Sequence, residues 1–249
     1  MPRIPASLSD VLALADADPA VLGVILSGSR AHEGMPTDRS DDDVHIVVGD
    51  GRPSVFDGLD GHRSARLDLV VMTLDAFRTR GLPGDPAAWS RYAYARAAVL
   101  RDASGGTVTR LLDRKRALTA EEGRTAARGW LDAYTNQTYR SLKSHRDGRP
   151  DAAHLDAAEA VPYLLETVFA LHLRVRPYNK YLRWELERHP LGAGVWSAGS
   201  LLPRLERVVA SGDAGEQRSL FGDVERAARA AGHGDVLDAW GDDLALLRG

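Results

Sequence analysis

The sequence predicts an α/β domain followed by an all-α domain. In the first half of the chain, three apolar runs separated by loops have the length and composition of buried strands, at residues 21–26, 44–48 and 66–72. The pattern changes at Thr119, because residues Thr119 to Glu122 form a Thr-x-x-Glu capping box and no convincing strand follows it. We therefore place a domain boundary there and predict domains at residues 1–117 and 118–249.

Local signals predict the elements of the first domain in order. Ser7 or Ser9 can cap a short helix that ends before Asp18, and the first strand follows. Loop-forming residues separate the second strand from the third. The remaining expected elements are a short capped helix, an outer strand and a longer helix after two glycines, at residues 73–80, 95–100 and 107–116.

The second domain is expected to contain helices only. Their apolar periodicity and end signals predict the ranges 120–146, 151–175, 179–188, 200–211 and 216–247. Breaks are expected in the last range, near Gly232 and Gly234. Pro162 lies inside the second helix, where it should weaken or kink the helix because proline lacks a backbone N–H.

The composition excludes several kinds of chemistry and partner. With 249 residues and 44% apolar content, the chain can bury one large or two smaller cores. It has no cysteine, which excludes disulfides and thiolate catalysis, and its net charge of −3 gives no basic footprint for nucleic acid. No apolar run approaches the roughly 20 residues that span a bilayer, and the first ten residues lack a signal-peptide pattern. We expect a cytoplasmic protein with neither nucleic-acid nor membrane partners.

A Gly-Ser turn and an acidic triplet carry the strongest functional signal. Gly28 and Ser29 follow the first strand, where exposed N–H groups and the serine hydroxyl can bond phosphate oxygens. Asp41 and Asp43 stand at the entrance of the second strand. Since side chains alternate along a strand, these two carboxylates should point the same way and share one or two divalent ions, with Asp42 facing the other side.

Asp68 is the candidate for a third metal-binding carboxylate. It stands in the otherwise apolar run of residues 66–72. A buried carboxylate is costly unless it meets a cation or hydrogen-bond donors, so Asp68 either binds metal or lies at a wet strand end. We favour metal, because Asp68 then completes an ordered set of phosphate-binding turn, paired carboxylates and third acid.

This ordered set resembles the DNA polymerase β-like nucleotidyltransferase superfamily, and within it the small-molecule branch that includes antibiotic nucleotidyltransferases. The family pattern of Gly-Ser, a spacer, Asp-x-Asp and a later acid matches residues across roughly the first hundred positions, namely Gly28, Ser29, Asp41, Asp43 and Asp68. The chain departs from it at Asp42, where the family often has an apolar residue.

The resemblance implies a fold and a reaction. The fold is a mixed sheet with flanking helices. The reaction is transfer of a nucleotide monophosphate, with AMP from ATP as the first choice, to a hydroxyl group of a small molecule, with Mg²⁺ as the metal cofactor. An aminoglycoside-type antibiotic is the favoured acceptor.

Our candidate nucleotide-binding residues are Gly28, Ser29, Arg30, Lys143 and Lys180. Lys180 stands out because Lys115, Lys143 and Lys180 are the only lysines among 32 Lys+Arg residues. A compact ammonium suits a phosphate, although a side chain packed on Trp184 is an equal alternative for Lys180. Lys143 shares a helix face with Asn136, Tyr139 and Arg140, and that face is alternatively a solvated surface.

Glu159 is our candidate for the base that deprotonates the acceptor hydroxyl. It shares a helix face with Tyr163 and Glu166 by helical spacing. This face is either an acidic rim that recognises an amine-bearing acceptor, or a solvent edge with a salt bridge to Arg140 or Arg176. In the first interpretation, Glu159 takes the proton and Glu166 binds the amine or a structural arginine.

Two other functions remain open from the sequence. The chain could adenylylate a partner protein, as short nucleotidyltransferase antitoxins do, although it is longer than those proteins and has a long helical half. It could also bind nucleotide as a regulatory module without turnover, which the intact set of Asp41, Asp43 and Asp68 disfavours. The protein is expected to be a monomer or a homodimer.

Overall fold

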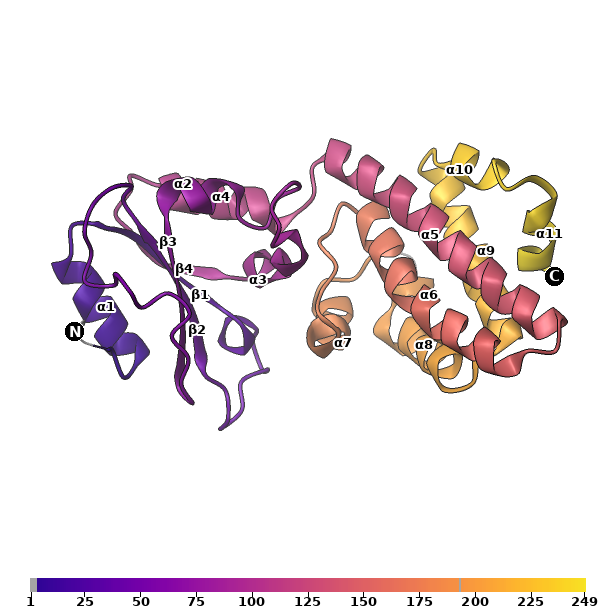
Figure 1. The fold of residues 1–249 in the computed structure, drawn as a ribbon, viewed down its shortest axis with the longest axis horizontal. Coiled ribbons are helices and arrows are strands. Elements are labelled where there is room, and N and C mark those ends of the chain that lie inside the picture. The colour runs from indigo at the N-terminus through magenta and orange to yellow at the C-terminus, as the bar shows by residue number, and fades with distance from the viewer. Residues whose placement is uncertain (1–3, 193) are drawn as a thin grey trace. The chain divides into compact units, whose positions relative to one another are not determined.

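The computed structural model describes residues 4–192 and 194–249, and the chain divides into two compact units, Met1–Ala117 and Leu118–Gly249 (Figure 1). Each unit has its own buried apolar core. Among the helices of the described residues, none combines the length and the apolar character needed to cross a membrane.

The first unit is built on a four-stranded mixed sheet. Its strands are β1 (Val21–Ser27), β2 (Asp42–Val48), β3 (Leu67–Thr73) and β4 (Ala98–Asp102), and their order in the sheet is β3-β2-β1-β4. Strand β1 is antiparallel to both β2 and β4, whereas β2 and β3 are parallel. The predicted α/β unit with a mixed sheet and flanking helices is therefore confirmed.

Helices cover both faces of this sheet (Figure 1). On one face, Val11 and Ala15 of α1 (Leu8–Ala17) pack with Val24, Val44 and Ile46. On the other face, α2 (Leu74–Thr79), α3 (Tyr92–Ala95) and α4 (Thr107–Arg116) contribute Phe77, Tyr94 and Leu112, which pack with Ile25 and Val47. Residues 43 and 45 of β2 share this second face with Val47, because strand side chains alternate.

The predicted start of the outer strand is wrong. The outer strand was expected at residues 95–100, but β4 begins at Ala98 because Tyr92–Ala95 forms the helical turn α3. Tyr92 and Tyr94 are buried there, so tertiary packing overrides the apolar run that suggested a strand.

The second unit is all helical, as predicted. Its helices are α5 (Ala120–Arg146), α6 (Pro150–Leu171), α7 (Asn179–Arg188), α8 (Ala198–Ser211), α9 (Ala214–Ala230), α10 (Gly234–Asp238) and α11 (Leu244–Arg248). The capping box at the start of α5 is present, with both the Thr119 and the Glu122 side chains bonded. Helix α6 continues through Pro162 but ends earlier than predicted, just before Leu173, which has a positive φ of 56°.

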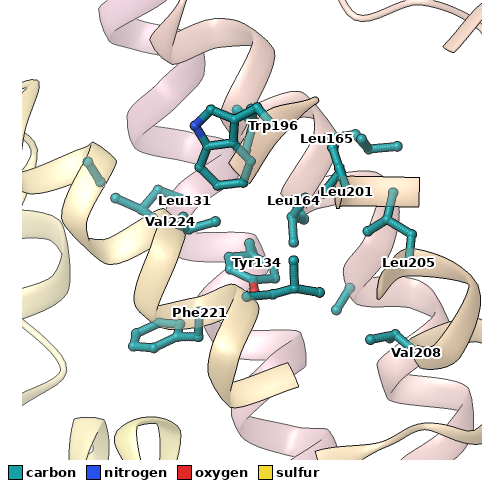
Figure 2. Close-up of a cluster of buried hydrophobic side chains, with 14 of the residues drawn as sticks. Leu131, Tyr134, Leu164, Leu165, Trp196, Leu201, Leu205, Val208, Phe221 and Val224 are labelled. Carbon is teal, nitrogen blue, oxygen red and sulfur yellow. The ribbon is translucent and has the colours of Figure 1, made fainter. Parts of the chain in front are cut away.

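The core of the second unit gathers apolar side chains from α5, α6, α8 and α9. Figure 2 shows part of this cluster, in which buried residues from the four helices meet, among them Leu131, Leu164, Leu201, Leu205 and Phe221. This packing fixes the positions of the helices that carry Lys143, Glu159 and Glu166.

Candidate metal centre

Three carboxylates converge at one end of the first unit's sheet. Asp41, Asp43 and Asp68 each offer an oxygen, and these oxygens all lie within 4.8 Å of one another. The sheet explains the convergence, because Asp43 and Asp68 are register partners on the parallel strands β2 and β3. Asp41 precedes β2 by one residue. The structure thus brings together the three carboxylates that the sequence singled out.

The donor set suits a divalent cation. All three side chains are half-buried, and carboxylates so close together repel one another unless a positive charge joins them. Carboxylate oxygens are the ligands that Mg²⁺ prefers. Asp68 is the second residue of β3, so it lies at a partly wet strand end and remains available as a ligand.

Arg63 already supplies positive charge to one of these carboxylates. Its Nε lies 3.7 Å from Oδ2 of Asp68, and the arginine side chain is 84% exposed. An ion pair this exposed contributes little to stability, so the guanidinium can be displaced when a metal binds. Sequence reasoning missed Arg63, since nothing local marks it as a neighbour of Asp68.

Gly28 allows the turn after β1 to pass directly over Asp43. The glycine has φ 65° and ψ −155° and begins the short 3₁₀ helix Ser29–Ala31. A Cβ atom at this position would lie 1.7 Å from Oδ2 of Asp43. Only glycine fits this backbone conformation and this approach. The adjacent Ser29 is buried, so its backbone is held firmly beside the carboxylates.

His32 fastens this turn to α3. The His32 ring is buried, and its Nδ1 donates to the carbonyl of Gly28 at 2.7 Å. Its Nε2 lies 3.2 Å from the Tyr92 hydroxyl. The contact with Tyr92 could not be foreseen from the sequence. This partner of His32 is 60 residues away along the chain, which no local pattern reveals.

His45 lies on the same face of β2 as Asp43. Its Nε2 is 3.0 Å from the Ser27 hydroxyl, and its ring centroid lies 5.0 Å from that of Tyr94. Burial, with a smaller contribution from the nearby charge of Arg80, lowers the pKa of His45 to about 4. The ring is therefore neutral at pH 7 and adds no positive charge beneath the carboxylates.

Asp42 faces away from the metal centre, as predicted. Its Oδ1 lies 2.9 Å from Nε of Arg30, whose Nη2 also donates to the carbonyl of Ser40 at 2.8 Å. This ion pair accommodates a charge where an apolar side chain was expected. Through the same contacts, Arg30 connects the turn after β1 to the loop that precedes β2. The nucleotide-binding role of Arg30 stays a prediction.

The remaining candidate residues belong to the helical unit. Glu159 is exposed and accepts a hydrogen bond from Nε2 of Gln137, whereas Glu166 pairs with Arg176 at 3.6 Å. Burial raises the pKa of Glu166, and the charge of Arg176 opposes that shift. The structural arginine foreseen for Glu166 is thus present. The role of Glu159 as a base stays a prediction.

Both candidate lysines of this unit are exposed. Nζ of Lys143 lies 5.9 Å from the ring centroid of Tyr139, and Nζ of Lys180 lies 5.2 Å from that of Tyr181. These positions are compatible with snorkelling side chains whose charged ends remain in solvent. Their contact with a nucleotide also stays a prediction.

Comparison with known proteins finds only distant structural likeness. No protein-family model matches the chain. No curated protein matches it significantly. Among solved structures, it is similar to a nucleotidyltransferase-like protein from Exiguobacterium sibiricum 255-15, with 14% sequence identity and a TM-score of 0.49. The likeness covers 94% of this chain and 78% of that one. The function of the chain therefore rests on its own residues.

Proposed function

We propose that the chain is a metal-dependent nucleotidyltransferase that moves AMP from ATP to a hydroxyl group of a small molecule. One observation carries the proposal. Oxygens of Asp41, Asp43 and Asp68 lie within 4.8 Å of one another, beside a glycine turn that only Gly28 can form over Asp43. A cation site next to a turn whose backbone N–H groups can bond phosphate oxygens is what phosphoryl transfer requires.

The residues of the first unit have separate tasks in this proposal. Asp41 and Asp43 hold Mg²⁺, and Asp68 completes a second metal site. When bound, Mg²⁺ neutralises charge on the transferring phosphoryl group and on the departing pyrophosphate. The backbone N–H groups at Gly28 and Ser29, together with the Ser29 hydroxyl, bond the phosphate oxygens.

The transfer itself is an in-line displacement. The acceptor oxygen forms a bond to the α-phosphorus while the bond from that phosphorus to pyrophosphate breaks. The acceptor proton passes to a base, which we assign to Glu159. Its hydrogen bond from Gln137 orients the carboxylate, whereas Glu166 is engaged by Arg176. The acceptor is a small hydroxylated compound, with an aminoglycoside-type antibiotic as the first candidate.

Metal binding can be tested without turnover. Mn²⁺ titration followed by electron paramagnetic resonance should show binding to the wild-type protein and a loss of at least tenfold in affinity for Asp43→Asn, which removes a ligand charge at nearly constant volume. Asp38→Asn is the matched control, because Asp38 is exposed and lies in the same loop. Equal Mn²⁺ affinity in all three proteins would show that the carboxylates do not form a metal centre.

Turnover is tested by mass spectrometry. The purified protein is incubated with each Mg²⁺·NTP and a panel of aminoglycosides, lincosamides and candidate proteins. An added nucleotide monophosphate on a small acceptor, lost in Asp43→Asn and retained in Asp38→Asn, is the expected result. A nucleotide on a protein would favour the protein-adenylylating alternative. Nucleotide binding without any product would favour the regulatory one.

A further inference from the structure

A groove in the helical unit is lined by none of the candidate site residues assigned above. It runs between α6, α7 and α8 and has a volume of about 570 Å³. This volume falls in the range of about 300–1,000 Å³ that is typical of small-molecule sites. The groove is lined by residues of the helical unit only, so it can be considered independently of the metal centre.

The floor of the groove is apolar. It is formed by buried side chains of the three helices, including Leu165 of α6, Leu182 of α7 and Leu205 of α8. Leu165 and Leu205 belong to the cluster drawn in Figure 2. On the wall, Val209 is 49% exposed although it adjoins this apolar floor. An apolar ligand body would shield that side chain from water.

The mouth of the groove carries one charge of each sign, and only the negative one lacks an ion-pair partner among the described residues. Arg183 and Glu206 both line it and both are exposed. Arg183 forms an ion pair with Glu187 at 3.6 Å. Within the part of the chain that the structure describes, Glu206 has no ion-pair partner. The groove therefore offers a carboxylate that a cationic ligand can pair with.

We propose that the α6–α7–α8 groove binds a small organic cation with an apolar body. The apolar part lies on the floor formed by Leu165, Leu182 and Leu205, and a protonated amine pairs with Glu206. Opposite charge at the mouth selects the cation over an anion of the same shape. This binding does not depend on the proposed nucleotidyltransferase activity.

The experiment compares three probes of equal shape and different charge. Phenylbutylamine, phenylbutanol and phenylbutyrate are titrated into the full chain, and binding is followed through the methyl NMR signals of Leu165, Leu182, Leu205 and Val209. We expect these signals to shift with the amine and the alcohol. The amine should bind at least tenfold more tightly than the carboxylate.

Variants separate the charge from the shape of the groove. Glu206→Gln should reduce the affinity for the amine to that for the alcohol and leave the alcohol unchanged. Glu121→Gln is the matched control, an exposed glutamate of the helical unit outside the groove. Ala210→Trp, a change at an exposed lining position, should abolish binding of all three probes by filling the groove.

Three outcomes would overturn the proposal. Equal affinities for amine and carboxylate, or an amine affinity that Glu206→Gln leaves unchanged, would exclude charge recognition. Self-association that Ala210→Trp removes, without binding of the probes, would assign the groove to a second copy of the chain. Asp43→Asn should bind the amine as tightly as the wild-type protein does. Amine binding therefore tests the groove, and Mn²⁺ binding tests the metal centre independently.

Discussion

At the scale of single residues, the metal centre depends on the absence of one side chain. The carboxylate of Asp43 occupies the space where a Cβ of residue 28 would lie, so the two residues are complementary in shape. The turn and the carboxylates are therefore coupled in structure, and a change in the turn should alter the affinity for metal.

Gly28→Ala should weaken Mn²⁺ binding by at least tenfold, because the new methyl group forces Asp43 to move. Gly34→Ala is a close control: Gly34 also has a positive φ, 77° against 65° for Gly28, but a Cβ there meets no atom within 4 Å. Both variants carry a penalty for a positive φ, and at Gly28 the ψ of −155° adds to it, because this region is almost restricted to glycine and costs about 1–3 kcal/mol. Mn²⁺ titration and thermal unfolding of both proteins separate the two effects. Equal Mn²⁺ affinities would mean that the turn does not constrain the site.

Lys115 is a second residue whose surroundings determine its chemistry. It is fully buried, with Nζ 3.2 Å from the carbonyl of Arg78 and 4.7 Å from the ring centroid of Phe77. Burial, aided by the charges of Arg91 and Arg114, lowers the pKa of Lys115 to about 8 from 10.5.

The free energy of unfolding should therefore depend on pH through Lys115. Between pH 8 and pH 10.5 the unfolded chain holds this proton more tightly than the folded one, so raising the pH stabilises the fold. The gain is at most about 1.4 kcal/mol per pH unit. Denaturant unfolding of wild type and Lys115→Met at pH 7, 8, 9 and 10 should show wild type gaining on the variant. If the difference in free energy of unfolding between the two proteins stayed constant from pH 7 to pH 10, the lowered pKa of Lys115 would be wrong.

At the scale of elements, local signals determined most helix ends. The capping box at Thr119 was recognisable because its two bonds join residues within one turn, and for the first helix the structure selects Ser7 from the two predicted caps, Ser7 and Ser9. Helix α4 begins and ends where two glycines and the apolar spacing placed it. The paired carboxylates followed from strand alternation alone.

Contacts between distant parts of the chain could not be predicted in this way. The bond from His32 to Tyr92 and the burial of Lys115 both depend on how elements pack. The helical turn α3 displaced the start of the outer strand for the same reason, because its tyrosines gain burial that a strand pattern does not anticipate.

Thr119→Ala should destabilise the helical unit by about 1 kcal/mol, the usual cost of losing an N-cap. Thr119 accepts a hydrogen bond from the Glu122 N–H at 3.2 Å, and the Glu122 carboxylate accepts one from the Thr119 N–H at 2.8 Å. Thr79→Ala serves as control, since its hydroxyl bonds a carbonyl at the end of α2 and caps no N-terminus. Equal denaturation midpoints for Thr119→Ala and wild type would exclude a stabilising cap.

At the scale of the whole molecule, the division into two units with separate cores predicts where a bound metal is felt. The sheet cores contain residues of the first unit only, and the helical core contains residues of the second only. A ligand that binds the folded state stabilises the unit that must be folded to form its site. For the metal centre, that unit is the one containing β1, β2 and β3.

Saturating Mn²⁺ should therefore protect the first unit selectively in hydrogen exchange. At a concentration about 100-fold above Kd, linkage gives about 2.7 kcal/mol of added stability. Amides of β1 to β3 should exchange about 100-fold more slowly where exchange needs unfolding of that unit, while amides of α8 and α9 keep their rates. Asp43→Asn should abolish the effect and Asp38→Asn preserve it. If Mn²⁺ slowed exchange equally in α8 and α9, the two cores would unfold together. If Mn²⁺ slowed exchange in neither unit, the assignment of a metal centre to this end of the sheet would be wrong.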